Sequence, residues 1–132
     1  MILDRILEHK RAELRHKQSR SYLADLKAAI RDAPPVLGFA VTLDATRSPA
    51  SPALIAEIKK ASPSLGLLRE DFSDKFDYLG LARTYQEHGA AALSVLTDKD
   101  FFQGDLRYLA EIKRALPIPA LNKEFMVDDV QF

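Results

Sequence analysis

The chain has 132 residues, of which 47% are hydrophobic and 29% are charged, a composition typical of one globular domain. Its 19 Lys and Arg balance 19 Asp and Glu, so no net basic field argues for binding to nucleic acid or a membrane surface. The lack of cysteine excludes disulfides and thiolate metal sites. No apolar run is long enough to cross a bilayer, and residues 1–8 carry charges unlike a signal peptide, which predicts a soluble, cytoplasmic protein.

The first part of the chain is predicted to consist of helices and loops. Residues 2–17 have apolar side chains on one side and charges on the other, the pattern of an amphipathic helix. Ser19 or Ser21 is a plausible cap for a second helix, which runs through Ile30 and is ended by two consecutive prolines. Residues 36–52 are rich in Pro, Ser and Thr and are predicted to be a surface connection.

From residue 53 onward, strand-like and helix-like segments alternate. Strands are predicted at residues 53–59, 91–97 and 118–125, and helices at residues 78–88 and 104–116. Asp77 is a plausible N-cap of the first of these helices, and Gly89 stands where a glycine often ends a helix. Asp128 and Asp129 resemble the acidic first turn of a third helix.

Strand–helix repeats of about 30 residues predict parallel strands joined by right-handed crossovers. An open dinucleotide-binding sheet would need a glycine-rich turn after its first strand, whereas this chain has Lys60-Ala-Ser-Pro-Ser-Leu-Gly66. Polar groups end each predicted strand, and catalytic groups drawn from successive strand ends are typical of a (β/α)8 barrel. We therefore expect an α/β TIM barrel whose first three strands lie in residues 53–132, preceded by an N-terminal helical extension of residues 1–52.

Two charges follow the first apolar strand and mark a candidate site. Because side chains alternate along a strand, Glu57 and Lys59 point the same way as Ile55. Inward-facing charges are costly unless they are paired or have a function. In a parallel sheet surrounded by helices, such charged side chains can reach water beyond the carboxyl ends of the strands, where active sites of such folds are found.

Three linked segments resemble the indole-3-glycerol phosphate synthase family in order and spacing. They are Glu57-Ile-Lys59-Lys-Ala-Ser62-Pro63-Ser64-Leu-Gly66, Leu93-Ser94-Val-Leu96-Thr97-Asp-Lys-Asp-Phe101-Phe102-Gln-Gly104 and Pro119-Ala-Leu-Asn-Lys123-Glu-Phe125. The resemblance implies a barrel of the ribulose-phosphate-binding type with extra N-terminal helices. It also implies ring closure, decarboxylation and dehydration of 1-(2-carboxyphenylamino)-1-deoxyribulose 5-phosphate, a step of tryptophan biosynthesis that uses no metal or organic cofactor.

The resemblance also implies roles for single residues. Lys123 corresponds to the general acid that protonates the ribulose carbonyl oxygen as the aromatic carbon attacks. Lys59 corresponds to the lysine that meets the anthranilate carboxylate, and Glu57 to the carboxylate that orients both lysines. Glu124 departs from the family motif, where Asp is more usual. The implied substrate-binding residues are Ser62, Pro63 and Ser64 of a closing loop, together with Leu96, Phe102 and Phe125.

Each of these positions also has an ordinary structural interpretation. Lys59 and Lys123 are then solvated strand-end lysines, Glu57 is a structural ion-pair partner, and Phe102 and Phe125 are core residues. The two serines beside Pro63 would simply shape a turn. The histidines lack acidic or cysteine partners at ligand spacing and are predicted to lie on the surface: His9, His16 and His88. Three loop aspartates lack the pattern of a calcium loop and are predicted to be solvated or capping: Asp71, Asp74 and Asp77.

The chain is expected to be a fragment, because the family's second glutamate, its asparagine and its phosphate-binding loops lie on later strands. We expect a small phosphorylated substrate, and a partner that is either a complementary C-terminal barrel portion or a second copy. Unpaired outer strands would expose apolar surface and favour self-association. Two other functions stay open: a barrel in which Lys123 is a Schiff-base nucleophile of the aldolase type, and a non-catalytic half-barrel.

Overall fold

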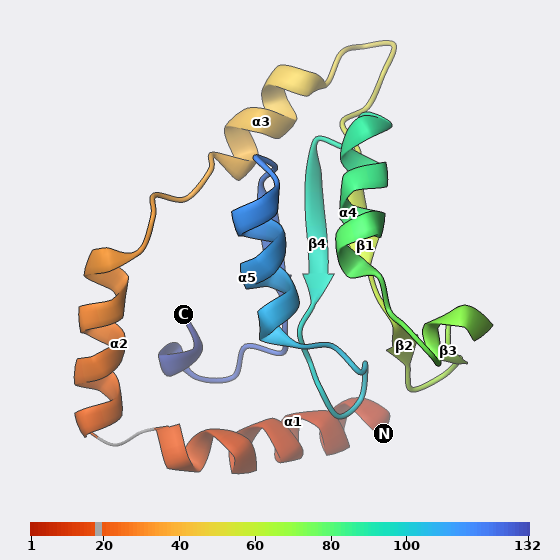
Figure 1. Ribbon diagram of the computed structural model, residues 1–132. Coiled ribbons are helices and arrows are strands. Elements are labelled where there is room, and N and C mark those ends of the chain that lie inside the picture. Colours follow the sequence, from red (N-terminus) through yellow and green to blue (C-terminus); the bar gives the residue numbers. More distant parts are fainter. Residues whose placement is uncertain (18–19) are drawn as a thin grey trace. The chain divides into compact units, whose positions relative to one another are not determined.

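The structure is a computed structural model that describes residues 1–17 and 20–132 (Figure 1). Contacts divide the chain into two compact units. The N-terminal unit contains Met1–Pro35 and Phe125–Phe132, and the sheet unit contains Val36–Glu124. The division into residues 1–52 and 53–132 stays a prediction. The three candidate catalytic residues, Glu57, Lys59 and Lys123, all belong to the sheet unit.

The N-terminal unit is helical. Helix α1 spans Ile2–Leu14 and continues as the 3-10 turn η1, Arg15–Lys17, which confirms the predicted amphipathic helix. Helix α2 spans Arg20–Asp32; of its two proposed caps, Ser19 lies outside the described residues and Ser21 lies within the helix. No helix in residues 1–17 and 20–132 is long and apolar enough to cross a membrane.

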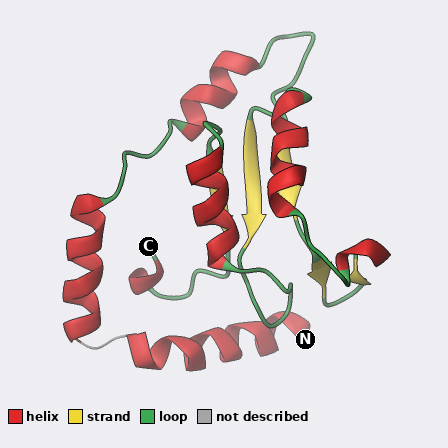
Figure 2. Ribbon diagram, in the orientation of Figure 1, coloured by secondary structure: helices red, strands yellow, loops and turns green. Residues whose placement is uncertain are grey.

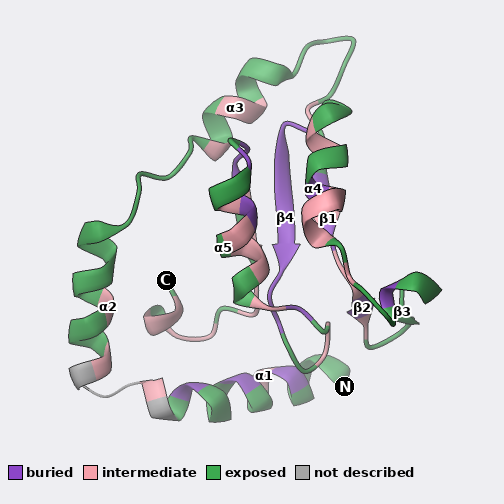
Figure 3. Cartoon of the chain, in the orientation of Figure 1, coloured by how far each residue is buried: buried purple, intermediate pink, exposed green. Residues whose placement is uncertain are grey.

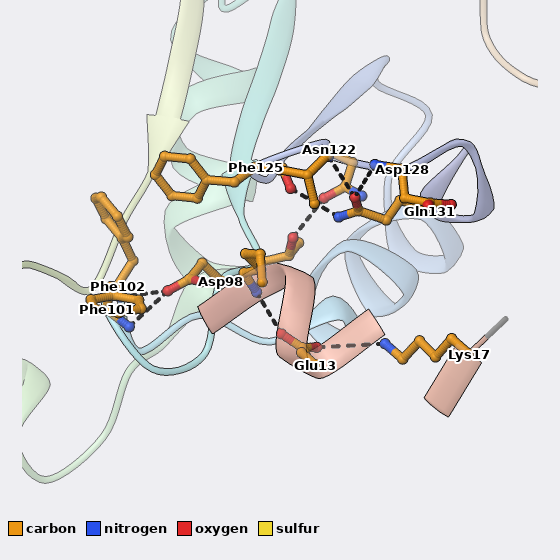
Figure 4. A network of polar contacts seen from close by, with 12 residues as sticks. Glu13, Lys17, Asp98, Phe101, Phe102, Asn122, Phe125, Asp128 and Gln131 are labelled. Atoms are coloured by element: carbon orange, nitrogen blue, oxygen red, sulfur yellow. Dashed lines mark hydrogen bonds and ion pairs between the residues drawn. The ribbon is translucent and has the colours of Figure 1, made fainter. Parts of the chain in front are cut away.

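The predicted acidic first turn at Asp128 and Asp129 forms as a capped helical turn. It is the 3-10 turn η3, which spans Asp129–Gln131 and has Asp128 as its N-cap. The Asp128 carboxylate accepts the N–H of Val130 at 3.0 Å, and Oε1 of Gln131 accepts the N–H groups of Val127 and Asp128 at 2.7 and 3.1 Å (Figure 4). These side-chain bonds form the capping box that is typical of a helix N-terminus.

The sheet unit holds a parallel sheet of three strands in the order β1-β4-β5 (Figures 1 and 2). The strands span Ile55–Ile58, Ala92–Leu96 and Ala120–Lys123. Helices α4 (Tyr78–Glu87) and α5 (Leu106–Ala115) connect consecutive strands and cover one face of the sheet. The predicted strands and helices of this part are confirmed, and the architecture is α/β with parallel neighbouring strands.

A core of apolar side chains lies between the sheet and these helices. Strand residues such as Ala56, Leu93 and Val95 pack there with Ala82 of α4 and Ile112 of α5, all at most 8% exposed. Alternation along β1 sends Ala56 and Ile58 into this core and leaves Ile55 and Glu57 on the opposite face. Strand β4 is buried throughout, as expected of the central strand (Figure 3).

A helix and a two-stranded hairpin of the sheet unit were not predicted. Helix α3, Phe39–Thr46, forms inside the segment predicted to be a surface connection; none of its residues is buried, so the segment lies at the surface but is partly helical. The hydroxyls of Thr42 and Thr46 donate to the carbonyls of Gly38 and Thr42 at 2.9 and 2.7 Å, which satisfies side chains that usually compete with a helix. Strands β2 (Ala61–Ser62) and β3 (Gly66–Leu67) form a small hairpin after β1.

The ends of α4 confirm the predicted capping signals. The Asp77 carboxylate accepts the N–H of Gly80 at 3.0 Å, and Gly89 follows the helix with φ of 89°. We expect Asp77→Ala to lower the free energy of unfolding by about 1 kcal/mol, because one helix N–H loses its partner. Denaturant unfolding of both variants checks this, with Asp74→Ala as the control on the same loop. Equal stability of the two variants would contradict the capping role.

Candidate active site

Glu57 joins the two candidate lysines. The Lys59 Nζ lies 2.6 Å from Oε1 of Glu57, and the Lys123 Nζ donates to Oε2 of the same carboxylate. Each carboxylate oxygen therefore has its own ammonium group. Lys123 is 66 residues away from Glu57 in the sequence, so only the folded sheet brings the three side chains together.

The register of the strands explains why these groups meet. Glu57 is opposite Ser94 of β4, and Lys123 is opposite Leu96, two residues further along the same strand. Residues two apart on a strand face the same way, so Lys123 shares the face of Glu57 one step nearer the carboxyl end of the sheet. Ser94 of β4 lies in register with Glu57 on β1 and with Leu121 on β5, between the two outer strands.

The cluster is partly desolvated and carries one net positive charge. Glu57 and Lys59 are 30% and 29% exposed, whereas Lys123 is 51% exposed. Burial alone raises the pKa of Glu57, but hydrogen bonds from Lys123 and Lys59 and their positive charges outweigh it and hold that pKa below its ordinary value. Two ammonium groups against one carboxylate make the end of β1 suited to an anionic group.

This lowered pKa makes a stability prediction. A carboxylate whose pKa is lower in the folded state stabilises the fold above its ordinary pKa of 4.5, and the contribution is lost as pH falls through the folded-state value. The difference in unfolding free energy between the wild type and Glu57→Gln should therefore be largest near neutral pH and shrink below 4.5. Urea unfolding at several pH values measures it, with Glu87→Gln on exposed α4 as control. A difference that grows on acidification would contradict the ion cluster.

The loop after β1 contains the predicted closing segment. The Ser62 hydroxyl accepts the N–H of Leu65 at 3.3 Å and lies 3.5 Å from the Ser64 hydroxyl, while Pro63 and Ser64 are exposed. Gly66 has φ of 67°, a left-handed backbone conformation that glycine adopts more readily than other residues and that tight hairpin turns often need. The structural role of Ser62 in this turn is thus confirmed, and a role of these three residues in substrate binding stays a prediction.

The loop after β4 presents Phe102. Asp98, which is 0% exposed, accepts the N–H groups of Phe101 and Phe102 at 2.7 and 3.1 Å through one carboxylate oxygen (Figure 4). The carbonyl of Asp98 accepts the N–H of Gly104 at 2.7 Å. Asp98 therefore fixes both ends of the loop that carries Phe102. Asp98 was not among the predicted site residues, although an acidic residue directly after a buried strand was the available signal.

The other predicted substrate residues lie in different surroundings. Leu96 is 4% exposed at the end of β4, so it is a packed residue opposite Lys123. Phe102 is half-buried. Phe125 begins the C-terminal segment of the N-terminal unit, where its carbonyl accepts the Gln131 side chain at 2.9 Å. The substrate roles of all three residues stay predictions.

A pocket of about 190 Å³ adjoins the charged cluster on the β1 side. It is lined by Glu57, Lys59, Leu68, Arg69, Phe72, Leu81 and Tyr85. The Arg69 guanidinium pairs with Asp71 through two hydrogen bonds of 2.9 and 3.0 Å and lies 5.0 Å from the centre of the Phe72 ring. The pocket joins an apolar wall to one cation of the cluster, Lys59. Its wall residues were not among the predicted site residues.

The structure places most of the groups predicted to be ordinary surface residues at the surface. His9 and His88 are exposed, and Nδ1 of His88 lies 2.8 Å from the carbonyl of Thr84. The side chain of His16 lies outside what the structure describes. Asp71 pairs with Arg69, and Asp77 caps α4. Across residues 1–17 and 20–132, no three His, Asp or Glu side chains are grouped to hold a metal ion.

Comparison with known proteins identifies the family. The family model described as indole-3-glycerol phosphate synthase matches residues 3–132. Proteins of that name from Acidithiobacillus ferrooxidans and Rhodospirillum rubrum are each 47% identical over 130 residues, which cover 98% of this chain and 48% of theirs. One from Desulforamulus reducens is 47% identical over 131 residues, 99% of this chain and 47% of its own.

The chain thus spans about half the length of the curated relatives it matches. The match runs through both units and includes the three segments that contain Glu57, Lys59 and Lys123. The chain belongs to the indole-3-glycerol phosphate synthase family.

Proposed function

We propose that this chain supplies part of the active site of an indole-3-glycerol phosphate synthase, a decarboxylating carbon–carbon lyase of tryptophan biosynthesis. Its substrate would be 1-(2-carboxyphenylamino)-1-deoxyribulose 5-phosphate. The single observation that carries the proposal is the cluster in which Glu57 holds Lys59 and Lys123 on separate oxygens. All three residues lie in the range that the family model matches, so family membership supports a catalytic role for the cluster.

In this proposal the two lysines have different tasks. Lys123 gives its proton to the ribulose carbonyl oxygen while the aromatic carbon attacks the carbonyl carbon, so the new carbon–carbon bond forms without a free alkoxide. Lys59 meets the anthranilate carboxylate, which later leaves as CO₂. Glu57 remains ionised, because its pKa is held low, and keeps both ammonium groups aimed at one region. Loss of water from the ring-closed intermediate then gives the indole.

The typical rate contributions of general acid catalysis and of proximity are consistent with these separate roles for the two lysines. General acid catalysis contributes about 10²–10⁴-fold. Holding the aromatic carbon against the carbonyl group contributes through proximity, which for well-oriented groups is worth about 7–11 kcal/mol. The pocket beside Glu57 and Lys59, with its apolar wall, supports the placement of an aromatic acid there.

We assign the sugar phosphate to a complementary barrel portion. Phosphate sites of this fold lie after strands seven and eight, whereas the described sheet has three parallel strands. Both outer strands, β1 and β5, have an open edge in that sheet, and Ile55 and Leu121 on its uncovered face are 43% and 48% exposed. These features support a partner portion that closes a (β/α)8 barrel.

The proposal is tested by restoring a complete barrel. The chain is fused to the segment that follows the matched part of the Acidithiobacillus ferrooxidans relative, and formation of indole-3-glycerol phosphate from the synthetic substrate is measured. A matched fusion that carries Lys59→Ala and Lys123→Ala is the control. Turnover that depends on the two lysines supports the proposal. A folded, monomeric fusion without turnover would overturn it.

A second candidate, a non-catalytic half-barrel that only associates, is favoured by the exposed apolar residues on the open face of the sheet. The same fusion separates the two functions, because an associating module would fold and remain inactive. Borohydride treatment in the presence of substrate covers the Schiff-base alternative, since only an aldolase-type lysine would be trapped as a covalent adduct.

A further inference from the structure

Lys123 lies at the end of a short outer strand of the described sheet, where few contacts fix its position. It is the last residue of β5, a strand of only four residues at the edge of the described sheet, and its side chain is 51% exposed. Within the described sheet its backbone bonds run to β4 only, so the position of this strand end depends on that neighbour. A general acid must nevertheless be held within a fraction of an ångström of its working position.

Thr97 supplies two bonds to this strand end. Its backbone N–H donates to the carbonyl of Lys123 at 3.2 Å, and its hydroxyl donates to Oδ1 of Asn122 at 2.7 Å. Thr97 follows directly after β4 and is only 6% exposed, so both bonds are shielded from water. Figure 4 shows Asn122 at this end of β5. The residue before Lys123 and the carbonyl of Lys123 itself are therefore tied to the central strand.

We propose that Thr97 is a positioning residue that acts through Asn122 to hold the Lys123 ammonium against Glu57. The inference rests on the proposed function only for the role of Lys123 as an acid; the positioning itself is a property of the sheet unit. The alternation of β5 places Asn122 and Lys123 on opposite faces, so a hydroxyl bond to Asn122 fixes the direction in which Lys123 leaves the strand. No substrate contact by Thr97 is involved.

The hydroxyl is the group to remove. Thr97→Val keeps the β-branched shape that the strand end requires and deletes only the donor to Asn122, which leaves a shielded amide oxygen without that bond. Thr97→Ser keeps the donor and loses a methyl group. A structural packing role would make the serine variant the worse one, whereas positioning through the hydrogen bond makes valine the worse one.

The titration of Glu57 reports the position of Lys123 without any need for activity. The charged groups on Glu57 are Lys59 and Lys123, and the hydrogen bond from Lys123 is among the causes that lower its pKa. We expect Thr97→Val to raise the pKa of Glu57 toward the value in a Lys123→Met reference, and Thr97→Ser to leave it as in the wild type. Carbon-13 NMR titration of the Glu57 side-chain carboxyl in the 132-residue chain measures this.

Two further variants complete the test. Thr84→Val removes an exposed helix hydroxyl bonded to the carbonyl of Gly80 and should not change the Glu57 titration. Asn122→Ala removes the acceptor and should raise the pKa as Thr97→Val does, which provides a result should the valine variant not fold. An unchanged Glu57 pKa in a folded Thr97→Val or Asn122→Ala chain overturns the inference.

The kinetic constants of the fused enzyme provide a second test of the positioning role of Thr97. Thr97→Val should lower kcat by up to about 10²-fold with a much smaller change in KM, and Thr97→Ser should restore kcat. A fall in stability with unchanged kcat would mean that Thr97 is only structural. If the wild-type fusion has no activity, the proposed function fails, while the NMR titration still decides whether Thr97 positions Lys123.

Discussion

Replacing Lys123 with alanine in the fused enzyme is expected to lower kcat by about 10²–10⁴-fold, the usual contribution of a general acid. The variant removes the proton donor and also one of the two cations that Glu57 holds. KM should change far less than kcat, because the proton is transferred in the transition state and not in the bound ground state. Initial rates over a range of substrate concentrations measure both constants.

Two companion variants separate proton transfer from charge. Lys123→Arg keeps a cation beside Glu57 but cannot release a proton near neutral pH, since the guanidinium pKa exceeds about 12. It should therefore lose kcat nearly as fully as the alanine variant. Lys113→Ala, in the last turn of α5 where the chain returns toward the start of β5, is the control and should keep wild-type rates. Full activity of the arginine variant would show that Lys123 acts as a charge alone.

Much of the sheet unit could be predicted because its signals are local. The alternation along β1 placed Glu57 and Lys59 on one face, and Asp77 and Gly89 marked the ends of α4 by their residue types alone. The same alternation predicts that Glu57 and Lys59 are close enough to pair. The reach of Lys123 across two strands does not follow from this alternation, because it depends on a register that only the folded sheet sets.

The missed elements have equally specific causes. Helix α3 is hidden in the sequence by its flanking prolines and its two threonines, whose hydroxyls bond to backbone carbonyls one turn earlier and so do not compete with the helical backbone bonds. The hairpin of β2 and β3 has strands of two residues, too short for a periodic pattern. Thr97 and Asn122 are paired across 25 residues by tertiary packing, and no local rule points from one to the other.

Gly104→Ala is expected to be the most damaging glycine substitution for the fold. A Cβ at this position would lie 2.8 Å from the carbonyl carbon of Leu96 and 2.9 Å from the carbonyl oxygen of Asp98, closer than real Cβ atoms approach backbone. The end of β4 would have to move, and with it the loop that presents Phe102. We expect a loss of at least about 1–3 kcal/mol in the free energy of unfolding, the range for overpacking a well-filled site.

Gly80→Ala is the matched control, because its Cβ would meet Asp77 at an equally short 2.8 Å from the carboxyl carbon. There the obstacle is the end of a side chain, which rotates away at the cost of a cap worth about 1 kcal/mol. Alanine regains a similar amount over glycine inside a helix, so stability should stay within about 1 kcal/mol of the wild type. Urea unfolding compares the two variants, and hydrogen exchange at the Phe101 and Phe102 amides, both bonded to Asp98, should accelerate only in Gly104→Ala. Equal losses for both glycines would mean that the strand end yields as easily as a side chain, and that the loop after β4 is not the rigid support that the position of Phe102 requires.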